Sequence, residues 1–108
     1  KTCRLSANDA ILVLSVGGGN AEKNISPNLV RAVDYAASIG AEIMGIVGRD
    51  GGHTKKATSF QTTPLVHVIP SIDAGLITPI TESFQSVICH MLVSHPLMAQ
   101  KQAKWESL

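Results

Sequence analysis

Three consecutive glycines, Gly17 to Gly19, stand among polar residues that could bind an anion. They follow an apolar run that ends at Leu14, and they precede a predicted helix start at Ser26. Glycine lets the backbone approach an oxyanion closely, and the N-terminus of a helix favours negative charge. Hydroxyl and amide side chains add donors at the same turn. The predicted phosphate-binding residues are Ser15, Gly17, Gly18, Gly19, Asn20, Asn24 and Ser26.

A purely structural connection between a strand and a helix is the alternative explanation of this turn. The turn also differs from two common nucleotide-binding motifs. A P-loop requires Lys and Ser or Thr after its glycines, where this chain has Asn20, and the dinucleotide motif requires a third spaced glycine, where it has Glu22. We therefore expect a smaller phosphorylated ligand, held by backbone and hydroxyl groups without a lysine.

A second set of polar residues, Glu82, Ser86 and His90, is spaced four residues apart. Residues four apart on a helix lie on the same side, so these three form one polar stripe. A solvent-exposed face is the ordinary explanation of such a stripe. An imidazole ordinarily titrates near neutrality, so His90 would also suit acid–base catalysis.

The composition favours a compact intracellular domain. The chain has 108 residues, of which 44% are hydrophobic and 16% are charged, with a net charge of +1. No basic stripe interleaved with aromatic residues is present, so we expect no binding to nucleic acid. The apolar runs are much shorter than the roughly 18 residues of a membrane span, and residues 1–9 are too polar for a signal peptide. We therefore expect a cytoplasmic protein without a membrane segment, with Cys3 and Cys89 as free thiols.

Alternating strand and helix signals would position these polar groups. The predicted strands are residues 10–16, 43–47 and 64–69. The predicted helices are residues 27–39, 54–58 and 79–94. This order predicts an α/β fold, with a parallel sheet and helices on both faces. Because three strands bury only a small core, we expect residues 1–108 to be a single, partial domain, with a polar tail at 97–108.

Several of these segments together resemble the second half of a SIS (sugar isomerase) domain, nearest to the phosphoheptose isomerase group. The resemblance covers about residues 9–95 and rests on the strand from Asp9, the glycine turn, the helix from Asn28 and the turn at residues 48–52. It implies a flavodoxin-like parallel sheet of which this chain is the C-terminal half. It also implies a phosphorylated sugar bound at the carboxyl ends of the strands, and homodimers or homotetramers with shared sites.

The same resemblance implies aldose–ketose isomerisation of a sugar phosphate such as sedoheptulose 7-phosphate, through an enediol. In the closing helix of that group a glutamine stands eight residues before a histidine, and here Glu82 and His90 hold those places. Both are therefore candidate catalytic residues. The group can carry zinc near these positions, so Glu82 and His90 are also candidate metal ligands, although nothing in the sequence requires a cofactor. A non-catalytic phosphosugar-sensing or assembly module is the alternative, since SIS domains also have these roles.

Overall fold

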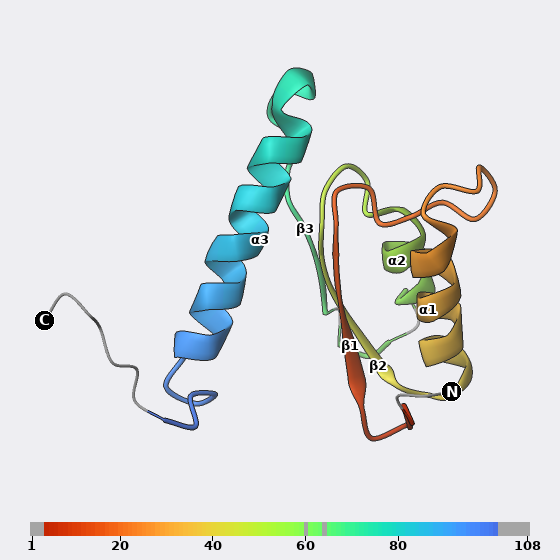
Figure 1. Ribbon diagram of the computed structural model, residues 1–108, viewed down its shortest axis with the longest axis vertical. Helices are drawn as coiled ribbons and strands as arrows, with labels where there is room; N and C mark the ends of the chain where they lie inside the picture. Colours follow the sequence, from red (N-terminus) through yellow and green to blue (C-terminus); the bar gives the residue numbers. More distant parts are fainter. Residues whose placement is uncertain (1–3, 60, 64, 102–108) are drawn as a thin grey trace, which may run out of the picture.

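Three parallel strands form the centre of the structure, in the order β1-β2-β3 (Figure 1). The computed structural model describes residues 4–59, 61–63 and 65–101, so Cys3, Pro64 and residues 102–108 of the predicted tail lie outside it. The strands are β1 (Ala10–Ser15), β2 (Glu42–Val47) and β3 (Val66–Val68). β1 pairs with β2 along its whole length, and their carboxyl ends lie opposite each other at Ser15 and Val47. The loops that follow these two strands therefore begin side by side.

The helices cover both sides of this sheet. α1 (Pro27–Ser38) and α2 (Gly52–Ala57) lie on one side, and α3 (Ile77–Ser94) lies on the other, after a short 3-10 helix at Ala74–Leu76 (Figure 1). The predicted α/β class, the parallel sheet and the order of elements are confirmed, and the predicted element ends differ from the observed ones by at most two residues. The arrangement is compatible with a flavodoxin-like fold.

The hydrophobic core lies between the sheet and α1. Alternate residues of β2, such as Ile43 and Val47, face α1, which places Val33 and Ala36 against them at helical spacing. Ile43 is 1% exposed and Val33 is 0% exposed. The buried cluster consists of Val13, Val33, Ala36, Ala41, Ile43 and Val47. This core holds α1 and the ends of β1 and β2 in fixed positions relative to one another.

α3 contacts the sheet at few points. Thr81 is its buried residue, and it lies against Gly48, where an added Cβ would come 2.4 Å from the Thr81 Oγ1. Further along the helix, Gln85 Nε2 donates to the Ile46 carbonyl at 2.8 Å. An adjacent apolar stripe is left in solvent, with exposed fractions of 47% for Phe84, 51% for Val87 and 65% for Met91. α3 is therefore an apolar helix with most of its surface uncovered.

The segment Ala74–Ser94 is also long and apolar enough to cross a membrane, judged by length and composition alone, and it is the one such helix in the described part of the chain. From the sequence we expected no membrane segment, because the unbroken apolar runs are much shorter than roughly 18 residues. The same exposed apolar surface would equally suit contact with another protein chain.

Candidate functional site

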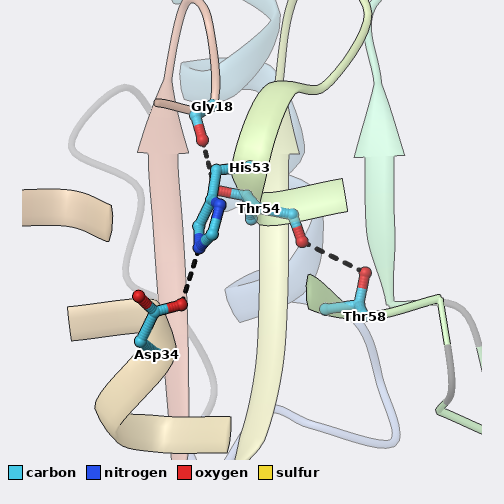
Figure 2. Close-up of polar contacts among 5 residues, drawn as sticks. All are labelled: Gly18, Asp34, His53, Thr54 and Thr58. Atoms are coloured by element: carbon cyan, nitrogen blue, oxygen red, sulfur yellow. Dashed lines mark hydrogen bonds and ion pairs between the residues drawn. The ribbon is translucent and has the colours of Figure 1, made fainter. Parts of the chain in front are cut away.

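Two glycine-rich turns, residues 16–20 and 48–52, meet at the carboxyl end of the sheet. They follow β1 and β2, which end side by side. The Thr54 N–H donates to the Gly18 carbonyl at 3.0 Å, and the Thr54 hydroxyl donates to the same oxygen at 2.9 Å (Figure 2). Thr54 lies in α2 and is fully buried, so these bonds fix the start of α2 against the first glycine turn.

Packing between these turns accounts for part of the glycine sequence. Gly18 has φ +67°, and an added Cβ would lie 2.0 Å from the Gly51 carbonyl oxygen. Gly19 has φ +76°, and an added Cβ would crowd side chains of α1. Gly17 differs, because the nearest atom to an added Cβ is Arg49 Cδ, 3.6 Å away. Close packing therefore explains why Gly18 and Gly19 are glycines. It does not explain Gly17, where an added Cβ would have room and would contact only the Arg49 side chain.

A cleft of about 730 Å³ opens beside the first glycine turn. Its walls come from both turns, from the loop that leads to α1, from α2 and from the start of α3. The lining residues are Ser15, Val16, Gly17, Gly19, Asn20, Ala21, Glu22, Lys23, Ile25, Ser26, Arg49, Asp50, Gly52, His53, Lys56 and Thr78.

Most of the predicted phosphate-binding residues lie around this cleft. The five that line it are Ser15, Gly17, Gly19, Asn20 and Ser26. Gly18 is buried between the turns, and Asn24 is exposed and stands outside the lining. Ser26 precedes α1 at the predicted cap position, but its φ is +51° and its side chain makes no capping hydrogen bond. The Ser26 hydroxyl is therefore available to a ligand instead of serving the helix.

Two backbone donors of the glycine turn are unpaired. Within the described residues, the N–H groups of Gly17, which is half-buried, and Gly19, which is buried, donate to no acceptor of the protein. The Gly18 N–H, by contrast, donates to Ser15 Oγ at 3.1 Å. Since Gly17 and Gly19 both line the cleft, an oxyanion bound there would supply acceptors for two backbone amides.

Cationic side chains from three different segments line the same cleft. Lys23 comes from the loop before α1, Arg49 from the turn after β2 and Lys56 from α2. The Arg49 side chain lies over Gly17, with its Cδ and Nε 3.6 and 3.9 Å from the position of an added Cβ. The sequence predicted a ligand held without a lysine, whereas two lysines line the cleft. Side chains distant in sequence meet here because parallel strands end at one edge.

Carboxylates are fewer and partly occupied. Glu22 and Asp50 line the cleft, and Asp50 Oδ1 accepts a hydrogen bond from the Gly52 N–H at 3.0 Å. That bond ties the Asp50 carboxylate to its own turn. The lining thus has three cationic side chains, Lys23, Arg49 and Lys56, against these two carboxylates, and this small excess of positive charge suits an anionic ligand.

One imidazole borders the cleft. It belongs to His53, in the first turn of α2, whose side chain is 20% exposed. The backbone N–H of His53 donates to the Gly19 carbonyl at 2.9 Å. Its Nε2 lies 2.6 Å from Oδ1 of Asp34 in α1 (Figure 2). The ring is thus held from both ends, through the backbone by the glycine turn and through Nε2 by a carboxylate.

The predicted catalytic residues lie elsewhere in the chain. Glu82 and His90 are exposed on α3, as is Ser86 between them, and none of the three lines the cleft. The start of α3 does reach the cleft through Thr78. Within this chain the polar stripe of α3 therefore faces solvent, and the structure brings neither Glu82 nor His90 together with the glycine turn.

The candidate metal ligands on α3 do not form a zinc site by themselves. Glu82 and His90 are separated by about 12 Å along the helix axis, at about 1.5 Å per residue, whereas zinc ligands lie about 2 Å from one ion. In residues 4–59, 61–63 and 65–101, no group of three or more His, Cys, Asp or Glu side chains could hold a metal ion. Cys89 in α3 is a partly buried free thiol.

No family model, curated protein or solved structure matches this chain. Membership of the SIS family therefore stays a prediction that rests on the residues quoted above. The geometry of the cleft is independent of that prediction, because it follows from the strand order and from the two turns.

Sequence reasoning missed the residues that give the cleft its charge and its imidazole. A signal for them was present, since the turn that contains Arg49 follows a strand predicted to be parallel to the first. The carboxyl ends of neighbouring parallel strands meet, which would have placed Arg49 beside Gly17. His53 and Lys56 are three residues apart, a spacing that puts both on one side of a helix.

Proposed function

We propose that this chain binds a phosphorylated sugar in the cleft beside the glycine turn. The observation that supports this most strongly is the convergence of three cations, two unpaired glycine amides and the Ser26 hydroxyl on one space. Arginine and lysine bind phosphate through charge-assisted hydrogen bonds, and glycine amides bind it without a side chain in the way. The remaining cleft volume has room for a sugar attached to the phosphate.

The reaction that we propose for the bound sugar is aldose–ketose isomerisation. The resemblance to the phosphoheptose isomerase group supports it, with a ketose such as sedoheptulose 7-phosphate as the substrate. This reaction requires a base that removes a proton from the carbon next to the carbonyl group, and an anchored phosphate that holds this carbon in place. The cleft provides cations for the anchor.

Calorimetric titration tests the binding part of the proposal. Sedoheptulose 7-phosphate should bind, and unphosphorylated sedoheptulose should bind much more weakly, because the cations contact the phosphate. Removing one charged contact should raise Kd by about 10- to 100-fold, since a hydrogen bond to a charged group contributes about 1.5–3 kcal/mol. The variants are Arg49→Gln and Lys56→Gln.

Matched controls separate the cleft from general electrostatics. Lys55 is the exposed neighbour of Lys56 on α2, and Arg31 is exposed on α1, and neither lines the cleft. Lys55→Gln and Arg31→Gln remove the same charge and should leave Kd within about twofold, because exposed charges at a distance are screened by salt. Equal losses in the cleft variants and the controls would contradict the proposed site.

A non-catalytic assembly or sensing module is the second candidate function, and the uncovered apolar surface favours it. Leu12 and Leu14 of β1 point away from the α1 side of the sheet and are 45% and 48% exposed. Phe84, Val87 and Met91 of α3, which lies on the same side of the sheet, are exposed as well, and we call these five side chains the apolar surface that another copy of the chain could bury. We propose a homodimer or homotetramer formed through this apolar surface.

A further inference from the structure

Among the described residues, one histidine contacts a carboxylate: His53 and Asp34 share a hydrogen bond, which becomes an ion pair when the imidazole is protonated, and His53 lines the proposed ligand site. The two residues are 19 positions apart, on α2 and α1, and their atoms Nε2 and Oδ1 are 2.6 Å apart. Asp34 is 59% exposed, and His53 is 20% exposed and lines the cleft. Of the two partners, the imidazole is the one that lines the cleft, whereas the carboxylate is the more exposed and is not part of the lining.

The position of His53 is fixed by the glycine turn. Its backbone N–H donates to the Gly19 carbonyl, and Thr54 next to it donates twice to the Gly18 carbonyl. The imidazole thus starts from a backbone segment that is attached directly to the loop proposed to hold the phosphate. A group placed in this way stays at a constant distance from the bound phosphate, and acid–base catalysis requires such a fixed position.

The pairing with Asp34 also decides which nitrogen is available. An ionised carboxylate only accepts hydrogen bonds, so in the neutral ring Nε2 carries the hydrogen and Nδ1 keeps its lone pair. Over the described parts of the chain, no residue hydrogen-bonds to Nδ1 of His53. The carboxylate would also stabilise the imidazolium that forms when Nδ1 takes up a proton.

From this geometry we propose that His53 is the acid–base residue for the sugar phosphate in the cleft, and that Asp34 is its positioning residue. This inference rests on the proposed function.

The C–H bond next to the carbonyl breaks, and its proton moves to Nδ1 of His53. The electron pair of that bond forms the C=C bond of an enediolate, while the carbonyl π pair moves to oxygen, which solvent protonates. Return of the proton from Nδ1 to the former carbonyl carbon, with loss of a proton from the neighbouring hydroxyl, gives the aldose.

Deuterium incorporation tests this step without knowledge of the final product. The full chain is mixed with sedoheptulose 7-phosphate in D₂O, and proton NMR follows the loss of hydrogen at the carbons next to the carbonyl. His53→Gln should slow incorporation by about 10²- to 10⁴-fold, the usual effect of a lost general acid or base. Its Kd by calorimetry should stay within about threefold of the wild-type value, because the phosphate contacts are unchanged.

Asp34→Asn is the second variant, and its readout separates positioning from stability. It should slow incorporation by about tenfold or more at an unchanged Kd, whereas a purely structural role would alter binding and thermal stability together. His67→Gln is the matched control, because His67 lies exposed on β3 and does not line the cleft. It should leave both quantities unchanged.

Each other outcome contradicts a defined part of the scheme. Failure of the wild-type chain to bind the sugar phosphate overturns the proposed function and this inference together. Binding without deuterium incorporation overturns the inference alone and favours the non-catalytic module. Normal incorporation by His53→Gln, with a loss in His90→Gln instead, overturns the inference in favour of the residue suggested by the sequence.

Discussion

At the scale of single residues, the three consecutive glycines have different roles. Gly18 and Gly19 have positive φ angles and allow close backbone or side-chain packing, whereas Gly17 leaves space that the Arg49 side chain covers. The sequence pattern predicts a phosphate-binding role for all three. The distinction depends on the second turn, whose backbone approaches Gly18 and whose position requires the strand pairing.

These roles predict unequal effects of the same substitution on the free energy of unfolding. Gly18→Ala combines a positive φ with a Cβ 2.0 Å from the Gly51 oxygen, and it should lower the free energy of unfolding by about 2 kcal/mol or more. Gly17→Ala should change it by less than about 0.5 kcal/mol. Urea denaturation followed by circular dichroism measures both. Equal stability of the two variants would show that the turns do not pack as described.

At the scale of elements, the contact between α3 and the sheet depends on the absence of a side chain at Gly48. An added Cβ would lie 2.4 Å from Thr81 Oγ1 and 2.7 Å from the Val16 carbonyl oxygen. We expect Gly48→Ala to destabilise the protein by about 1–3 kcal/mol, the usual cost of overpacking a filled site.

The double variant Gly48→Ala, Thr81→Ala tests whether Thr81 is the residue that is displaced. Removing the Thr81 hydroxyl and methyl should recover part of the loss, and thermal unfolding of the two single variants and the double variant measures the coupling. Strictly additive losses would place the strain at the Val16 carbonyl alone.

The order and type of the elements could be predicted from the sequence because their signals are local. Pro27 and Gly40 mark the two ends of α1, and unbroken apolar runs mark β1 and β2. The charge of the cleft was missed because it depends on which strands are neighbours. The order of strands cannot be predicted from any one segment of the sequence. Arg49 and His53 reach the first glycine turn only through the parallel pairing of β1 with β2 and through hydrogen bonds to main-chain oxygens.

The environment of α3 was likewise beyond local reasoning. Its apolar and polar positions follow helical spacing, as predicted, but the apolar stripe is wider than the part that the sheet covers. Two polar residues make its contact with the sheet: Thr81 is buried against Gly48, and the Gln85 amide donates to the Ile46 carbonyl. A search for apolar core positions finds neither. A catalytic role of Glu82 and His90 stays a prediction. Both residues lie on α3 and are exposed to solvent.

At the scale of the whole molecule, the uncovered apolar surface on β1 and α3 predicts self-association. β1 is an edge strand, and burial of Phe84 and Met91 against a second copy would remove exposed apolar area from water. Sedimentation at low micromolar concentration should show a dimer or tetramer. Phe84→Glu together with Met91→Glu should shift the population to monomer, since burying two unpaired charges strongly opposes association.

Ser86→Glu provides the control for that measurement. Ser86 is exposed on the opposite side of α3, so the added charge should leave the oligomer unchanged. A wild-type chain that sediments as a monomer and unfolds cooperatively would contradict the predicted assembly. An oligomer that survives the double variant would place the interface on another surface.

The hydrogen bonds from α2 to the glycine turn have a consequence for how this protein could change over evolution. The joint is made largely of main-chain groups, the N–H groups of His53 and Thr54 and the carbonyls of Gly18 and Gly19. Main-chain groups are the same whichever side chains are present, so mutations at Arg49 or Lys56 leave the joint in place. Substitutions at the rim of the cleft could therefore change which ligand is preferred, while the hydrogen bonds between α2 and the glycine turn are retained.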